Sequence, residues 1–183
     1  MIVACSPLRS HVNLSTIMRT AGCCGVKEVI ATGNAKVDVR IARDGVEEVA
    51  LTVKRSLPPV LKKLKEQGYL LIGLEQATGS ENLHEYCFPR KCVLVIGAER
   101  EGISQQCLDL MDAVVEIPVW GLPFSYNVAT ATSLCLYGGL CVPLRTRIRT
   151  RIRTVSDRLR LGRPSGIGLH CTPATHTRPP HLK

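Results

Sequence analysis

Short apolar segments alternate with segments of helical periodicity along the first 140 residues, and this alternation constrains the fold more than any other feature of the sequence. Strands that are almost continuously apolar and are separated by helices favour a parallel sheet with helices on both faces. We therefore expect an α/β domain with about five or six strands. The segments with the strand pattern are 2–5, 29–32, 69–75, 92–97 and 113–119.

Helical signals lie between these strands. An apolar stripe with helical spacing begins at Leu57, two prolines occupy its first turn, and Gly68 follows its end. Residues 34–56 are polar and weakly periodic and receive no assignment, and the stretch 76–91 has the composition of a loop. The expected helices span 11–24, 57–67, 105–112 and a segment that begins near Asn127.

The charge is distributed unevenly over the 183 residues. Residues 1–140 contain 14 Lys+Arg and 14 Asp+Glu, so the whole formal charge of +9 comes from 141–183. We expect a domain over 1–140 and a basic tail over 141–183, disordered because it cannot bury enough apolar surface. The tail is either a nonspecific nucleic-acid-binding arm or a carboxyl terminus without a selected role.

Cysteine content and hydropathy exclude several classes of protein. The nine cysteines are odd in number and form no C-x-x-C pair, which favours reduced core thiols and no metal site. No apolar run approaches the roughly 20 residues that cross a bilayer, and the amino terminus does not resemble a signal peptide. We expect no membrane association and a cytoplasmic protein, with an organelle or the nucleus as alternatives.

Ligands of parallel α/β sheets bind at the carboxyl ends of the strands, so the polar loops there are candidate sites. The sequence GAEREG (97–102) has the glycine spacing of a P-loop, but Ile103 replaces the lysine that would bind phosphate. The sequence WGLPFSYN (120–127) follows another expected strand. No G-x-G-x-x-G follows a strand, so a nucleotide-binding Rossmann domain is poorly supported.

Three stretches together carry a specific resemblance: NLSTIMRTAGCCG (13–25), GAEREG (97–102) and IPVWGLPFSYNVATA (117–131). They resemble, in order, the three motifs of the SpoU/TrmH-type 2′-O-ribose methyltransferases of the SPOUT superfamily, over essentially residues 1–137. The residues that match these motifs are Asn13, Arg19, Glu99, Ile117, Pro118, Gly121, Ser125 and Asn127.

This resemblance implies a parallel sheet with a carboxyl-terminal trefoil knot, S-adenosylmethionine as cofactor, RNA as substrate and a homodimer that completes the active site. Structured RNA would be methylated on the ribose 2′-hydroxyl, and we expect tRNA ahead of rRNA because no RNA-binding module is evident. The implied catalytic residues are Arg19, Asn13, Glu99, Ser125 and Asn127. The implied cofactor-binding residues are Gly97, Gly102, Ile117, Tyr126 and Leu74.

The role of Arg19 stays open. The resemblance assigns it to deprotonation of the 2′-hydroxyl, yet a guanidinium is almost always charged, which favours holding a phosphate and stabilising alkoxide charge. Arg19 could also be an ordinary surface arginine, Glu99 a solvated loop acid, and Asn13 and Asn127 helix caps.

The carboxyl-terminal end departs from the family pattern. Gly138, Gly139 and Pro143 are expected to end the last helix early, which would weaken cofactor binding and dimerisation. An alternative function is therefore a catalytically weakened RNA-binding protein that uses the basic tail.

Overall fold

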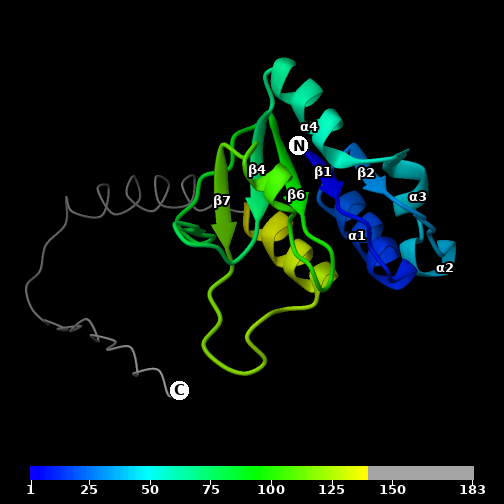
Figure 1. Cartoon of the computed structure of the whole chain (residues 1–183). Helices are drawn as coiled ribbons and strands as arrows, with labels where there is room; N and C mark the ends of the chain where they lie inside the picture. Colours follow the sequence, from blue (N-terminus) through cyan, green and yellow to red (C-terminus); the bar gives the residue numbers. More distant parts are fainter. Residues whose placement is uncertain (140–183) are drawn as a thin grey trace, which may run out of the picture. The chain divides into compact units, whose positions relative to one another are not determined.

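The computed structural model describes residues 1–139, so the predictions about Pro143 and the tail over 141–183 lie outside the described residues. The described part contains one sheet of seven parallel strands in the order β3-β2-β1-β6-β4-β7-β5 (Figure 1). The strands are β1 (Ile2–Cys5), β2 (Glu28–Thr32), β3 (Ala50–Lys54), β4 (Leu70–Leu74), β5 (Glu81–Asn82), β6 (Cys92–Ile96) and β7 (Ala113–Glu116). The predicted α/β fold with a parallel sheet is confirmed.

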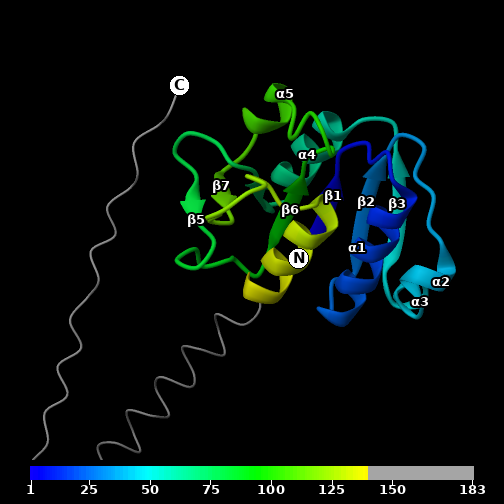
Figure 2. The same ribbon diagram turned by 90° about the horizontal axis from the view of Figure 1, so that it is seen from below.

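Helices cover both faces of this sheet. Successive side chains of a strand point to opposite faces, so an all-apolar strand makes both faces apolar and both must be buried. In β1, Val3 and Cys5 pack in one core cluster, while Ile2 and Ala4 pack in the other. Figure 2 shows α4 and α5 on one face, and α1 and the last helix, drawn in yellow, on the other. The helices are α1 (His11–Cys23), α2 (Val39–Ala42), α3 (Gly45–Glu48), α4 (Leu57–Glu66), α5 (Gln105–Leu108) and a last helix over 128–139.

Two strands lie in segments without a strand pattern. Strand β3 falls inside the unassigned segment 34–56 and lies at an edge of the sheet, where most of its residues are partly or fully exposed. Strand β5 has only two residues and lies inside the expected loop 76–91. Both strands extend the sheet at its edges, so the expected count of about five or six becomes seven.

Gly138 and Gly139 are both helical and are the last described residues, so the expected early end of the last helix stays a prediction. Gly139 is buried, and a Cβ built on it would lie 2.7 Å from Cδ2 of Phe88. The glycine therefore lets the helix approach the Phe88 ring, and this packing offsets the roughly 1 kcal/mol that glycine costs inside a helix. The trefoil knot implied by the family resemblance stays a prediction.

The buried cysteines behave as small apolar residues. Burial raises the pKa of Cys5 and of Cys135 to about 12, so both remain neutral thiols near neutral pH. No helix within residues 1–139 is long and apolar enough to cross a membrane.

Candidate active site

A cavity of about 520 Å³ lies at the carboxyl ends of β4, β6 and β7. Its walls are the loops that follow these strands and the beginning of the last helix. It brings together eight of the ten site residues expected from the sequence: Leu74, Gly97, Glu99, Gly102, Ile117, Ser125, Tyr126 and Asn127. The volume falls within the about 300–1,000 Å³ that is usual for small-molecule sites.

The loop 97–102 is closed by its own backbone. The amide of Ala98 donates to the carbonyl of Gly102 at 3.0 Å, and the amide of Gly102 donates back to Ala98 at 3.1 Å. A Cβ on Gly97 would lie 2.4 Å from the carbonyl carbon of Gly102, and one on Gly102 would lie 2.5 Å from Oε2 of Glu75. Gly102 also has φ +66°, a conformation that side chains disfavour. The loop therefore needs both glycines to keep this closed conformation.

Glu99 joins this loop to the beginning of α1. Its Oε2 accepts the amide of Arg9 at 3.0 Å, and its Oε1 accepts the amide of Ser10 at 3.1 Å and Nδ2 of Asn13 at 3.0 Å. Burial alone raises the pKa of the Glu99 carboxyl, but these hydrogen bonds outweigh it, so its pKa lies below the usual value. Glu99 is therefore a bound carboxylate and not the solvated loop acid of the alternative interpretation.

Asn127 combines a helix cap with a contact between motifs. Its Oδ1 accepts the amides of Ala129 at 2.9 Å and Thr130 at 3.4 Å, which caps the last helix. Its Nδ2 donates to Oδ1 of Asn13 at 3.2 Å. Hydrogen bonds thus link Glu99 to Asn13 and Asn13 to Asn127, and this network connects all three motif segments.

Comparison with known proteins agrees with this arrangement. The family described as the SpoU rRNA Methylase family matches residues 1–137. The chain belongs to this family.

Curated members of the SpoU family include modifiers of two kinds of RNA. The chain is 32% identical over 130 residues to the 23S rRNA (guanosine-2'-O-)-methyltransferase RlmB of Bordetella pertussis, covering 68% of this chain and 53% of that protein. It is 31% identical over 128 residues to the tRNA (guanosine(18)-2'-O)-methyltransferase of Escherichia coli K12, covering 68% of this chain and 56% of that one. The chain thus spans about half the length of these relatives.

Solved structures of SpoU proteins share the fold. The A. aeolicus TrmH/SpoU tRNA modifying enzyme superposes with a TM-score of 0.74 at 24% identity, covering 81% of this chain and 78% of that one. The Streptomyces viridochromogenes SpoU methyltransferase AviRb, solved with AdoMet, gives a TM-score of 0.70 at 24% identity, covering 81% of this chain and 61% of that one.

Against this SpoU background, the position of Arg19 stands out. Arg19 is exposed and is not among the residues that line the cavity. It lies six residues after Asn13, which turns it about 120° around the axis of α1. On that side α1 meets α3, since a Cβ on Gly45 would lie 3.0 Å from Cα of Arg19. Asn13 therefore reaches the cavity network, and Arg19 does not do so within one chain.

Several cavity residues did not emerge from the motif matches. Glu75 follows β4 directly and accepts the amide of Ile103 at 2.9 Å, so it holds the end of the glycine loop. The rule that ligands bind at carboxyl ends of parallel strands pointed to this position, but no motif singled it out. The other unpredicted lining residues are Gln76, Ile96, Ala98, Arg100, Pro123, Val128 and Ala131.

Proposed function

We propose that this chain binds S-adenosylmethionine in the 520 Å³ cavity and methylates the ribose 2′-hydroxyl of RNA. The observation that supports the proposal most strongly is the hydrogen-bond network of Glu99, Asn13 and Asn127, which joins the three SpoU motif segments at the cavity. Relatives in the family are named as 2′-O-methyltransferases of rRNA or tRNA, and one solved relative holds AdoMet.

The residues present fit this cofactor. Gly97 and Gly102 line the cavity without side chains of their own, and Leu74 and Ile117 supply apolar walls. When bound, S-adenosylmethionine would supply the methyl group from its positively charged sulfur to the ribose 2′-oxygen; the sulfur would leave as the neutral thioether S-adenosylhomocysteine, and the hydroxyl proton would pass to water. Asn127 caps the amino terminus of the last helix at the cavity. That helix terminus carries the positive pole of the helix dipole, which would favour a substrate phosphate there.

We also propose a homodimer in which a second copy supplies Arg19 to the cavity. Within one chain Arg19 lies away from the cavity, so a dimer is the way for it to act there. Exposed apolar side chains support an interface on α1 and the last helix: Val12 is 45%, Leu134 42% and Tyr137 70% exposed. The two helices are joined by a 2.9 Å hydrogen bond between Thr20 and Ser133, so their exposed residues can belong to one surface.

The first test is calorimetric titration of S-adenosylmethionine into the full chain, followed by methyl transfer to an unmodified tRNA pool and to 23S rRNA fragments. We expect saturable binding and methylation of RNA, faster on tRNA, with the product resistant to alkaline cleavage at the modified ribose. A folded chain that binds RNA but no S-adenosylmethionine would overturn the enzyme proposal and favour a plain RNA-binding protein.

The dimer is tested by mixing two inactive variants, Arg19→Ala and Asn127→Ser, where serine retains a capping oxygen. If Arg19 acts across the interface, half of the sites in mixed dimers are intact, and randomly exchanged dimers regain roughly a quarter of wild-type activity. A mixture no more active than the separate variants would show that Arg19 does not act in a partner's site.

A further inference from the structure

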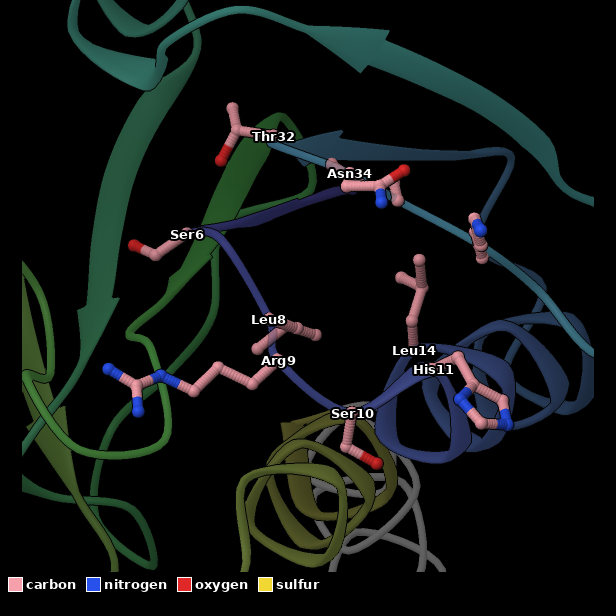
Figure 3. A pocket seen from close by; sticks show the side chains of 11 residues that line it. Ser6, Leu8, Arg9, Ser10, His11, Leu14, Thr32 and Asn34 are labelled. Atoms are coloured by element: carbon pink, nitrogen blue, oxygen red, sulfur yellow. The ribbon is translucent and has the colours of Figure 1, made fainter.

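A second cavity, of about 120 Å³, lies beside the first at the carboxyl ends of β1 and β2. Figure 3 shows its walls: the loop after β1 with Ser6 and Ser10, the beginning of α1 with His11, and the end of β2 with Asn34 beyond it. The motif matches and the proposed function assign no role to this cavity. Its remaining lining residues are Leu8, Arg9, Leu14, Ala31, Thr32, Ala35 and Lys36.

The two cavities share a wall. Arg9 and Ser10 line the second cavity, and both donate their backbone amides to Glu99, which lines the first. An RNA strand whose ribose enters the first cavity can therefore place a neighbouring backbone phosphate at the second.

The charges around the second cavity suit an anion. His11 and Lys36 line it, no lining residue is acidic, and the 13-residue helix α1 begins at His11 with the positive pole of its dipole. The neighbouring carboxylates are already engaged. Glu99 accepts three hydrogen bonds, and Glu101 pairs with the exposed Arg9 guanidinium at 3.3 Å.

On the other side of the cavity, Asp38 is also engaged. It pairs with Arg40 at 3.1 Å, and it is not among the residues that line the cavity. The hydrogen bond from the Arg40 side chain holds the pKa of the Asp38 carboxyl below its usual value, so Asp38 stays ionised and paired.

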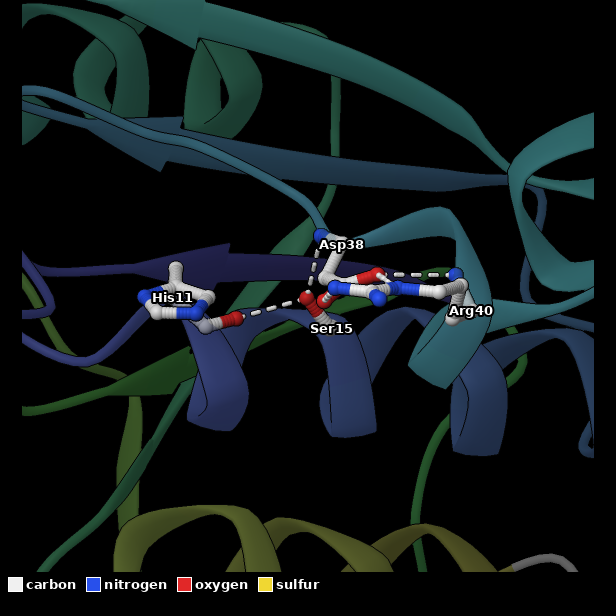
Figure 4. Close-up of polar contacts among 4 residues, drawn as sticks. All are labelled: His11, Ser15, Asp38 and Arg40. Atoms are coloured by element: carbon white, nitrogen blue, oxygen red, sulfur yellow. Dashed lines mark hydrogen bonds and ion pairs between the residues drawn. The ribbon is translucent and has the colours of Figure 1, made fainter.

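Ser15 fixes the two walls relative to each other. It is fully buried, its hydroxyl donates to the carbonyl of His11 at 2.6 Å, and it accepts the amide of Asp38 at 2.8 Å. Figure 4 shows these contacts between the beginning of α1 and the segment that follows Lys36. The cavity is therefore already formed by the protein's own hydrogen bonds.

We propose that the second cavity binds a backbone phosphate of the RNA next to the nucleotide whose ribose is methylated, with Lys36 and His11 as its phosphate-binding residues. This inference rests on the proposed function and extends it to the substrate strand. A phosphate contact positions the strand without reading its sequence, so it contributes to RNA affinity and to ribose placement.

The test compares Lys36→Ala with Lys62→Ala, an exposed lysine of α4 that lines neither cavity. Affinity for an unmodified tRNA transcript is measured over a range of salt concentrations. Loss of one phosphate contact lowers the slope of log affinity against log salt by about 0.7–0.9. We expect this change and a higher KM for RNA in Lys36→Ala, with Lys36→Arg restoring the slope and Lys62→Ala leaving it unchanged.

Affinity for S-adenosylmethionine separates this inference from the function on which it rests. It should be unchanged in Lys36→Ala, since Lys36 lies outside the first cavity. If the wild-type chain binds S-adenosylmethionine and methylates RNA while Lys36→Ala and His11→Ala both keep the full salt slope, the second cavity is not a phosphate site. If the wild-type chain binds no S-adenosylmethionine, the proposed function itself falls.

Discussion

Replacing Glu99 by glutamine should loosen the junction between the glycine loop and α1. The carboxylate accepts one hydrogen bond at Oε2, from Arg9, and two at Oε1, from Ser10 and Asn13. Glutamine keeps one acceptor oxygen, so it can retain the two hydrogen bonds from Ser10 and Asn13. Its NH₂ group would then face the Arg9 amide, and two donors cannot form a hydrogen bond. One charge-assisted bond worth about 1.5–3 kcal/mol is lost and two become neutral bonds worth about 0.5–1.5 kcal/mol. Because Glu99 is half-buried and water can reach it, we expect a net loss of about 2–3 kcal/mol.

Urea unfolding at neutral pH measures this loss as a lower midpoint at unchanged m-value. The pKa of Glu99 is lowered in the folded chain, so its contribution is present above the unfolded pKa of about 4.3 and disappears as pH falls through the folded value. The gap between wild type and Glu99→Gln should therefore narrow below about pH 4. Glu101→Gln, at an exposed carboxylate, is the matched control and should change stability by less than about 0.5 kcal/mol. Equal stability of the two variants at neutral pH would refute the reasoning.

Three further substitutions test other parts of the structure. Gly97→Ala places a Cβ 2.4 Å from backbone of its own loop and should cost at least about 1–3 kcal/mol and weaken S-adenosylmethionine binding in calorimetry, whereas Gly121→Ala, with open space around it, should change the unfolding midpoint little. Ser15→Ala leaves the amide of Asp38 without its acceptor and should cost about 1–3 kcal/mol in urea unfolding; an unchanged midpoint would mean that this contact does not hold the second cavity. Asp112→Asn removes a carboxylate whose pKa lies below its usual value: burial raises it, but hydrogen bonds from a β4 amide and an α4 lysine lower it by more. The substitution should destabilise the fold by about 1–2 kcal/mol at neutral pH and by less at pH 3, which thermal unfolding at both pH values measures.

The central strands, and the proximity of the motif segments to one another, could be predicted from the sequence. Strands β1, β4 and β6 are apolar on both sides, so their pattern is visible without any partner. Since parallel strands end at one edge of the sheet, residues as distant as Glu99 and Asn127 could be expected near each other. Edge strand β3 carries no such pattern because its burial is partial, and its place in the sheet depends on β2.

The details of the site depended on three-dimensional contacts. A capping role for Asn127 follows from its residue type, but its bond to Asn13 depends on how the last helix docks against α1. The orientation of Arg19 is set by the turn of α1 relative to α3, which periodicity alone leaves open. The hydrogen bond from the Asp38 amide to Ser15 joins residues 23 positions apart. No sequence pattern announces it, because a serine inside a helix indicates by its residue type only a weak helix former.

The position of β1 at the centre of the sheet also governs the order in which the chain can fold. Ile2 pairs with Glu28 on one side and with Val93 on the other. Closing the longer of these two loops costs about 1 kcal/mol more chain entropy than closing the shorter one. During synthesis, β1 and β2 can pair long before β6 leaves the ribosome, so the half of the sheet that carries the large cavity forms last. We expect amides of β6 and β7 to gain protection from hydrogen exchange later in refolding than those of β2, which makes the cavity the late-forming unit of the fold.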